Sequence, residues 1–293
     1  MDSSVEDDIY AATSGTTLDV PVSMRHLALG ADLIYYYALE TNTKYVISSG
    51  ISDMALPLYK KLRFHILSFP RMMLLCNARS IIESKGLSGL PLKILAGLIN
   101  VPIKIFLSFL RWKSKNLLAR FKVVRTTKIP NWVDDITVRD GHKYMEVHDC
   151  NWLQWNLDYN FKGDKNDIQS FYCIYKRNKP IGFFMTKERY RENAGGKLKN
   201  IVLGAIVEWG FYPHCELNEE IIYKMALSTF SKNVDIIEFA SADVDTCKKM
   251  KNFGFIKHGD ANIALKDKTK KCKDASNIDL WRIRYGYADV ILT

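Results

Sequence analysis

The residues best suited to chemistry lie near the start of the chain, in the run Arg25-His-Leu-Ala-Leu-Gly30-Ala31-Asp-Leu33. Small residues at Gly30 and Ala31 let backbone N–H groups approach a pyrophosphate, and the N-terminus of a helix adds a favourable dipole. The run therefore predicts a phosphate-binding turn between a strand and a helix. Because short glycine patterns often arise by chance, an ordinary basic loop is the competing interpretation.

Strands and helices that alternate along the chain must position this turn. We expect a strand at residues 16–22, a helix at 23–42, a strand at 44–50, a helix at 52–64 and an extended run at 65–75. Pro57 lies inside the second helix and should kink it or shift its start. This alternation predicts βαβ units with neighbouring parallel strands.

The turn resembles the CoA-binding motif of the GNAT superfamily of N-acetyltransferases, Gln/Arg-x-x-Gly-x-Gly/Ala with a leucine three residues later. Arg25, Gly30 and Leu33 match this motif, and Ala28 replaces its first glycine. The substitution is sterically mild, although it loosens the fit to a phosphate.

A second stretch, residues 52–64, is similar to the GNAT pattern Asn-x-x-Ala-x-x-Leu-Tyr-x-x-Leu-Gly-Phe, with Ser52 for Asn and Arg63 for Gly. The spacing agrees throughout. Two matches in the right order and separation are stronger than either alone.

The resemblance implies acyl-CoA chemistry, with acetyl-CoA as cosubstrate and no metal. It places the acyl group between splayed strands near residues 20–22 and 44–48. Tyr59 would protonate the departing thiolate, since a phenol of pKa ~10 can donate to a thiolate of pKa ~8.5; a tyrosine that merely packs its helix is the alternative. The expected cofactor contacts are Val20, Val22, Arg25, His26, Ala28, Gly30, Ala31 and Ser52.

The second half repeats the order strand, helix, strand, short helix and strand, which indicates a duplicated architecture. At the position of the CoA turn it reads Tyr-Pro-His-Cys-Glu-Leu-Asn, and Glu216, Glu219 and Glu220 near the helix start would repel a pyrophosphate. We therefore expect no CoA binding in this half, which could shape the acceptor site instead. Aromatic runs at residues 151–156 and 281–289 suit a sugar or peptide acceptor, with core packing as the alternative.

The positive charge gathers in one segment between the halves. The chain carries a formal charge of +10, and residues 85–128 contain ten Lys or Arg and no Asp or Glu. Residues 90–110 are almost long and apolar enough to span a bilayer, but Lys93, Lys104, Pro91 and Pro102 favour an interfacial or packed helix. Contact with a membrane surface is therefore expected to be peripheral, through residues 85–122. No nucleic-acid motif frames the basic residues.

The six cysteines are scattered without CxxC pairs or nearby histidines at ligand spacing, which indicates neither a disulfide framework nor a zinc site. The acidic N-terminus lacks the features of a signal peptide. We expect a cytoplasmic protein, with membrane-peripheral attachment as a variant of that location.

These patterns together predict an α/β fold with two GNAT-like mixed-sheet modules joined by a basic apolar helical connector. A complete GNAT domain has about three strands and two helices before the CoA turn, so we expect the first module to be truncated at its N-terminus. The alternative is that the second module supplies the missing sheet structure. The expected function is transfer of an acetyl group from acetyl-CoA to an amine or hydroxyl of an unknown small-molecule, sugar or peptide acceptor. The alternative is an inactive GNAT-like remnant that acts as a membrane-surface or protein interaction module. The expected divisions are a disordered tail at 1–15, a partial GNAT-like domain at 16–84, the connector at 85–122 and a second GNAT-like domain without a CoA turn at 123–293.

Overall fold

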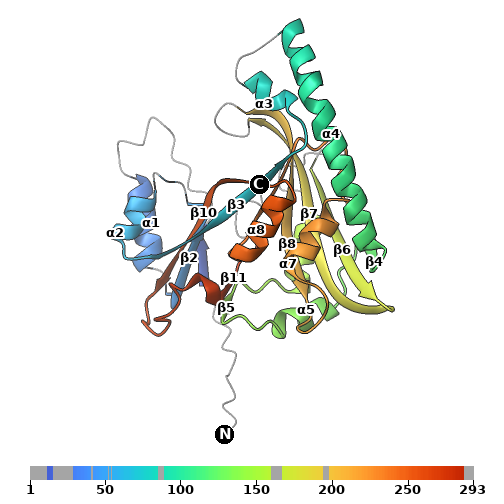
Figure 1. Ribbon diagram of the computed structural model, residues 1–293. Helices are drawn as coiled ribbons and strands as arrows, with labels where there is room; N and C mark the ends of the chain where they lie inside the picture. Colours follow the sequence, from blue (N-terminus) through green and yellow to red (C-terminus); the bar gives the residue numbers. More distant parts are fainter. Residues whose placement is uncertain are drawn as a thin grey trace. The chain divides into compact units, whose positions relative to one another are not determined.

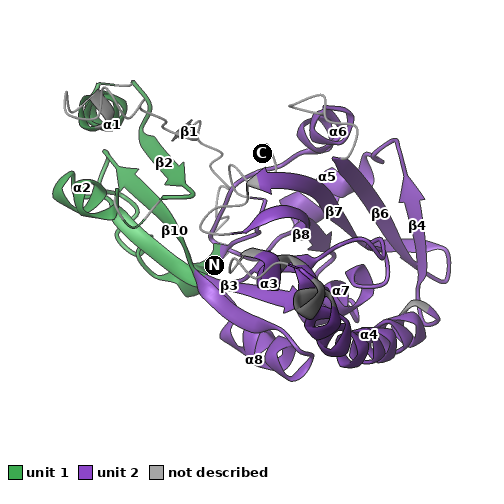
Figure 2. Ribbon diagram, turned by 90° about the horizontal axis from the view of Figure 1, so that it is seen from above, with its two compact units in different colours: residues 1–69, 260–281 green, residues 70–259, 282–293 purple. Residues whose placement is uncertain are grey.

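The computed structural model describes residues 12–15, 29–40, 42–51, 53, 55–84, 89–159, 167–193 and 198–286. The chain divides into two compact units, coloured separately in Figure 2. Unit 1 comprises residues 1–69 and 260–281, and unit 2 comprises residues 70–259 and 282–293. Each unit therefore draws on distant parts of the sequence.

Unit 1 is a small sheet with two helices. Its elements are β1 (Ala12–Gly15), α1 (Leu29–Leu39), β2 (Tyr45–Ser49), α2 (Leu56–Lys61), the start of β3 (His65–Leu75), the end of β10 (Ile256–Asp267) and a 3-10 turn at Ile278–Leu280. β1 is parallel to β2, and β10 is antiparallel to β2 on its other side. This confirms the predicted parallel βαβ arrangement for the first half.

The core of unit 1 comes from the apolar positions of α1, β2 and α2. Its buried members are Ile34, Ala38, Val46, Ile51, Tyr59, Phe64 and Ala264. Pro57 stands in the first turn of α2, where a helix has no N–H bond to lose, so the proline shifts the start of the helix to Leu56 instead of kinking it.

Strand β1 corrects one prediction. Ala12–Gly15 lie in the segment expected to be a disordered tail, but their backbone pairs with β2 from Tyr45 to Ser48. The sequence signal there was weak because only Thr13 favours a strand, while the alanine and glycine of this run do not, and sheet pairing outweighs that local preference. The strand predicted at residues 16–22 lies outside the described residues.

Unit 2 holds a mixed sheet of order β3-β9-β8-β7-β6-β4, in which β8 and β9 are parallel and the other pairs are antiparallel. Figure 1 labels most of its elements, which are α3 (Arg79–Ser84), α4 (Leu90–Leu118), β4 (Lys122–Thr126), α5 (Trp132–Val138), β5 (Tyr144–Met145), α6 (Cys150–Asp158), β6 (Ile168–Lys176), β7 (Lys179–Asn193), β8 (Lys199–Phe211), α7 (Glu219–Ala226), β9 (Ile236–Ala240) and α8 (Val244–Asn252). β11 (Trp281–Arg282) lies where the chain passes back from unit 1 to unit 2.

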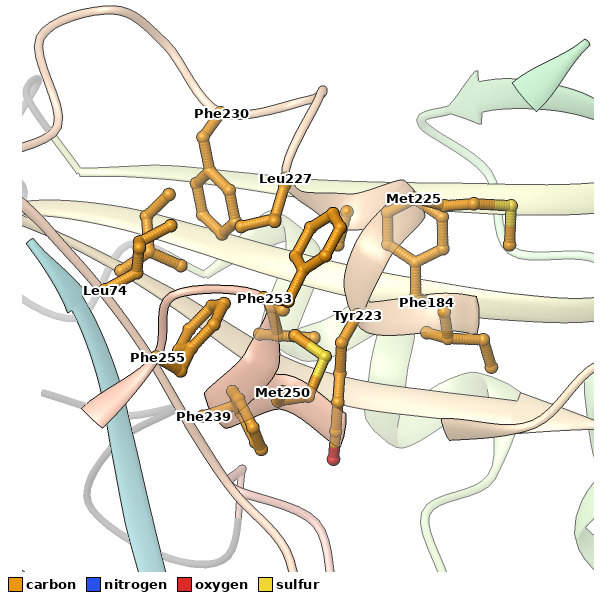
Figure 3. Packing of buried hydrophobic residues seen from close by; sticks show 14 of the residues in the cluster. Leu74, Phe184, Tyr223, Met225, Leu227, Phe230, Phe239, Met250, Phe253 and Phe255 are labelled. Carbon is orange, nitrogen blue, oxygen red and sulfur yellow. The ribbon is translucent and has the colours of Figure 1, made fainter. Parts of the chain in front are cut away.

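Helices cover both faces of the unit 2 sheet. α4, α7 and α8 lie on one face, and α5 and α6 lie on the other (Figure 2). The core under α7 and α8 is rich in aromatic rings, and Figure 3 shows Tyr223, Phe239 and Phe255 packed there. The ring centroids of Tyr223 and Phe239 are 4.2 Å apart, and those of Phe239 and Phe255 are 5.0 Å apart. Such rings bury large apolar areas and fix the sheet against the helices.

Most of the described part of the predicted helical connector forms one continuous helix, α4, over Leu90–Leu118. Pro91 stands in its first turn, and Pro102 lies inside it without ending it. Pro102 removes one backbone hydrogen bond. Ala96 and Leu110, on either side of the proline, are 3% and 2% exposed, so both ends of the helix are held by packing.

Each half of the sequence contributes its last strand to the other half's unit. β3 follows α2, but its residues 71–75 pair with β9 in unit 2. β10 follows α8, but its residues 263–267 pair with β2 in unit 1. The boundaries predicted at 84/85 and 122/123 therefore separate segments of the sequence and not compact units. The boundaries between the compact units lie at 69/70, 259/260 and 281/282.

Candidate functional site

The described part of the predicted active site centres on Tyr59. This residue lies on α2, and its hydroxyl is 2.7 Å from the Oγ of Ser48 on β2, with either oxygen able to donate. Ser48 pairs with Gly15 in the last pair of the parallel β1–β2 ladder. The phenol oxygen is thus held beside the end of this ladder.

Tyr59 is also a core residue. Its side chain is 7% exposed, and its ring meets that of Phe64 edge to face with centroids 5.1 Å apart. The packing interpretation of Tyr59 is correct for the ring. The hydroxyl has a polar partner, so the same residue can place a proton donor without leaving a buried group unpaired.

The predicted CoA turn lies mostly outside the described residues, which leave out Val20, Val22, Arg25, His26, Ala28 and Ser52. α1 begins at Leu29, so Gly30 and Ala31 lie in its first turn. The first N–H groups of a helix have no partner within the helix, and they are available to an anion. Gly30 and Ala31 thus lie at the start of a helix, and their contact with CoA stays a prediction.

The matching region of the second half is built differently. β8 and β9 are parallel but pair only from Leu203 to Ala205, although β8 continues to Phe211. The register between β7 and β8 shifts where Val207 has no partner residue of its own. A bulge of this kind bends a strand and opens it away from its neighbour. β8 and β9 therefore separate beyond Ala205.

A segment of the chain itself, Arg282–Gly286, reaches into this opening. The N–H of Gly286 donates to the carbonyl oxygen of Val207 on β8 at 2.6 Å, and the hydroxyl of Tyr285 donates to Glu238 Oε2 on β9 at 2.7 Å. Arg282 Nη2 donates to the carbonyl oxygen of Trp209 at 3.2 Å. Residues 282–286 thus form hydrogen bonds with polar groups of both β8 and β9.

The N-terminus of α7 is also occupied by residues of the chain. The Asn218 side chain accepts from the N–H of Ile221 at 2.9 Å and caps the helix. The Glu219 carboxylate accepts from the Ser241 hydroxyl at 2.5 Å, and its removal from water raises its pKa to about 7. Above that pH it is negative and would repel a phosphate.

Unit 2 holds a buried charge cluster, formed by His148, Glu208 and Arg284, that the sequence analysis did not predict. His148 Nδ1 lies 3.2 Å from Glu208 Oε1, and Arg284 Nη1 donates to Glu208 Oε2 at 2.9 Å. His148 Nε2 lies 3.3 Å from Glu146 Oε1. The His148 ring stacks on Trp152 with centroids 3.5 Å apart. The imidazole of His148 and the guanidinium of Arg284 therefore share the Glu208 carboxylate, and Glu146 places a second carboxylate beside His148.

The carboxylates decide the charge of His148. Burial, the largest single influence, lowers the pKa of this imidazole, but Glu208 and Glu146 together outweigh it and raise the pKa above its ordinary value. His148 and Glu208 are 1% and 0% exposed, respectively. The one sequence signal was Glu208 itself, a lone acid within the apolar run Ile201–Gly210.

The aromatic runs suggested for an acceptor divide between core and surface. Trp281 and Tyr285 are buried, so the packing alternative is correct for these two. Trp155 is 47% exposed and stacks on Tyr159 with centroids 5.2 Å apart. Among the described residues, no group of three or more His, Cys, Asp or Glu is arranged to hold a metal ion.

Comparisons with known proteins show likeness in fold but not in sequence. No family model matches the chain, and no curated protein matches it. Saccharomyces cerevisiae N-myristoyltransferase with bound myristoyl-CoA is similar in structure, with a TM-score of 0.54 and 12% identity over 87% of this chain and 58% of that one. A second structure of the yeast enzyme, with myristoyl-CoA and inhibitors, gives a TM-score of 0.53 at 12% identity and covers 87% of this chain and 60% of that one.

Two further solved structures align at a TM-score of 0.45. A GCN5-related N-acetyltransferase from Anabaena variabilis is 11% identical over 85% of this chain and 52% of that one, and a tandem GNAT protein from the clavulanic acid biosynthesis pathway is 10% identical over 85% of this chain and 71% of that one. The chain thus spans just over half the length of the Anabaena protein and under two thirds of the yeast enzyme.

The fold is similar to that of the yeast N-myristoyltransferase. The chain also contains the internal repeat that its sequence predicted, in which β1-α1-β2-α2-β3 and β8-α7-β9-α8-β10 follow the same order. Both repeats also contain one parallel strand pair, β1–β2 and β8–β9.

Proposed function

We propose that this chain is an acyl-CoA-dependent acyltransferase that uses a single CoA site, in its first half. The observation that carries the proposal is the Tyr59 hydroxyl, held by Ser48 at the end of the parallel β1–β2 ladder. α1 follows this ladder, with Gly30 and Ala31 in its first turn. A phosphate-binding helix start and a proton donor thus belong to one βαβα unit.

The reaction that suits these groups is direct acyl transfer. An acceptor amine or hydroxyl attacks the thioester carbon, the carbon–sulfur bond breaks, and the acceptor loses one proton. The CoA sulfur leaves as a thiolate and takes a proton from the Tyr59 phenol, which the Ser48 hydroxyl can assist by a hydrogen bond. The proton that the acceptor loses passes to solvent water, and the phenolate takes one proton back from solvent, so acyl-CoA and acceptor yield acylated acceptor and free CoA with no net change in protons.

Two features of the second half support a stoichiometry of one CoA per chain. Its strand opening contains Arg282–Gly286, and the start of α7 is capped by Asn218 and carries Glu219. A pyrophosphate there would meet a carboxylate and a helix start that is already capped. The second half would then serve the acceptor, an amine or hydroxyl compound of the small-molecule, sugar or peptide class.

Calorimetry with acetyl-CoA tests the proposal directly. We expect micromolar binding with a stoichiometry of one per chain, lost when Arg25→Glu is combined with Gly30→Trp. Glu216→Gln is the matched control, since it removes a charge beside α7 and leaves the first half unchanged. Acetyl-CoA and myristoyl-CoA compared in the same experiment would assign the acyl chain.

Absence of binding by the intact, folded chain would contradict the proposal. Two equivalents per chain would contradict the assignment of the site to the first half alone. In the first case the inactive GNAT-like interaction module becomes the better function, and the exposed face of α4 is the feature that favours it.

A further inference from the structure

Helix α4 exposes an apolar stripe along most of its length. Leu98, Ile105 and Trp112 recur every seven residues and are 67%, 66% and 58% exposed, respectively. At 100° per residue these positions lie on one face of the helix. Further large apolar side chains exposed on the described part of α4 are Ile94, Leu95, Ile99, Val101, Phe106 and Phe109. Monomeric soluble proteins seldom expose a contiguous surface of this kind without a partner.

The opposite face of the same helix is packed. Leu110 belongs to the core of unit 2, and Ser114 is 0% exposed with its hydroxyl donating to the Leu110 carbonyl at 2.9 Å. Near the other end, Asn100 accepts from the N–H of Ala78 at 2.8 Å, which ties α4 to the start of α3. Figure 1 shows α4 beside α3, on the outside of unit 2. The helix is therefore part of a folded unit.

The charge beside the stripe has one sign. Lys104 and Lys115 are exposed and border the stripe on one side at helical spacing. The ammonium of Lys113 lies 5.1 Å from the centre of the Phe109 ring. Residues 85–128 contain no acid at all. Lysine stems can lie along an apolar layer while their ammonium groups reach lipid phosphates.

Length and composition alone would allow α4 to cross a membrane. Residues Ile94–Leu117 pass such a test, with a mean hydropathy of 1.7. A crossing, however, would pull Leu110 and Ser114 out of the folded unit and place Lys104 within the hydrocarbon. A lysine at the centre of a membrane helix costs about 3 kcal/mol on insertion scales. If α4 instead lies in the plane of the membrane surface, Leu110 and Ser114 stay packed in unit 2 and the lysines can reach the lipid phosphates.

From the apolar stripe and its uniform positive border, we propose that α4 docks unit 2 onto the surface of an anionic phospholipid membrane. The apolar side chains enter the boundary between headgroups and acyl chains, and Lys104, Lys113 and Lys115 contact lipid phosphates. The docking is separate from CoA binding and does not depend on enzymatic activity.

The test is sedimentation of the full chain with vesicles of phosphatidylcholine, with or without phosphatidylglycerol. We expect binding to the mixed vesicles only, and weaker binding as salt is raised. Combining Leu98→Ser, Ile105→Ser and Trp112→Ser should lower the partition coefficient about tenfold or more, because three apolar side chains no longer leave water. The matched control combines Val138→Ser, Val244→Ser and Ile256→Ser, which replace side chains 70%, 58% and 54% exposed elsewhere in unit 2 and should leave binding unchanged.

Four results would overturn the proposal. Wild-type protein could fail to bind the anionic vesicles, or bind neutral vesicles equally well. Bound protein that resists extraction by alkaline carbonate would show that α4 inserts across the bilayer. A dimer in light scattering, lost in the α4 triple variant and without vesicle binding, would assign the stripe to a second copy of this chain. Near-UV circular dichroism of each variant separates loss of docking from loss of fold.

Discussion

The hydroxyl of Tyr59 and the Oγ of Ser48 lie 2.7 Å apart, and they join α2 to the β2 strand at the point where its parallel pairing with β1 ends. This one contact satisfies a buried phenol and also holds it beside the start of the proposed cofactor site. Packing and proton donation are therefore properties of the same side chain, and substitution can separate them.

Tyr59→Phe should keep the fold and lose catalysis. Loss of one buried hydrogen bond costs about 1 kcal/mol of folding stability. Loss of a general acid should lower kcat by about a hundredfold or more. Acetyl-CoA binding, measured by calorimetry, should change little. The matched control is Tyr37→Phe, which removes another hydroxyl that donates to β2 in unit 1. Equal kcat in both variants would remove Tyr59 from the mechanism.

Leu110 and Ile105 on α4 should differ sharply in their effect on stability. Leu110 is 2% exposed and Ile105 is 66% exposed. Leu110→Ala should lower the free energy of unfolding by about 2–5 kcal/mol because it leaves a cavity. Ile105→Ala should change it by less than about 0.5 kcal/mol. Urea denaturation followed by tryptophan fluorescence measures both. If the two variants are alike, α4 does not pack on unit 2 in solution.

Glu219 should make the protein less stable as pH rises. Its pKa is raised in the folded state to about 7, so between the unfolded value near 4.5 and about pH 7 the folded chain holds a proton that the unfolded chain has lost. Stability from this group is full below that window and falls through it. Glu219→Gln should abolish this fall, which is on the order of 3 kcal/mol for a pKa raised from 4.5 to about 7.

Urea midpoints of wild type and Glu219→Gln at about pH 5 and about pH 8 measure the difference. The variant should gain stability relative to wild type at the higher pH. Glu220→Gln at the next position is the control, because Lys224 and Lys249 hold the pKa of that carboxyl below its usual value despite burial. A gap between wild type and Glu219→Gln that does not change with pH would refute the assignment.

His148 should titrate above the usual range of histidine because Glu208 faces it. With the folded pKa raised, the stabilisation from His148 is present below the unfolded value of about 6.5 and is lost as pH rises through the folded value. Glu208→Gln should lower the pKa of His148, and it should cost about 3–5 kcal/mol of stability by leaving Arg284 without its carboxylate.

The Cε1 proton resonance of His148 in an NMR titration reports this pKa, and the exposed His214 serves as an internal reference. An unchanged His148 titration in Glu208→Gln would show that the 3.2 Å contact does not govern its charge.

Local sequence predicted the elements of the first half well where periodicity was strong. β2, α2, β3 and the helical nature of the connector were all predicted from apolar spacing and turn residues. β1 was not, because its four small residues form a strand only through pairing with β2. Pairing between strands that are distant in the sequence produces no signal in the local sequence of either strand.

The candidate site, too, could be predicted only in part from the sequence. Tyr59 was predicted from its motif, but its partner Ser48 was not, since the contact depends on how α2 packs on β2. The cluster of His148, Glu208 and Arg284 gathers residues from three distant segments. Of these three residues, only Glu208, an acid in an apolar strand, was recognisable from the sequence as a buried charge.

The exchange of closing strands determines when each unit can fold as the chain leaves the ribosome. The partner of β2 in β10 lies more than two hundred residues downstream, so one edge of β2 stays unpaired until β10 has been made. A fragment of residues 123–293 would lack β3 and leave β9 as an open edge, prone to pair with other chains. Each half of the sequence, made alone, would therefore lack a strand that completes its sheet.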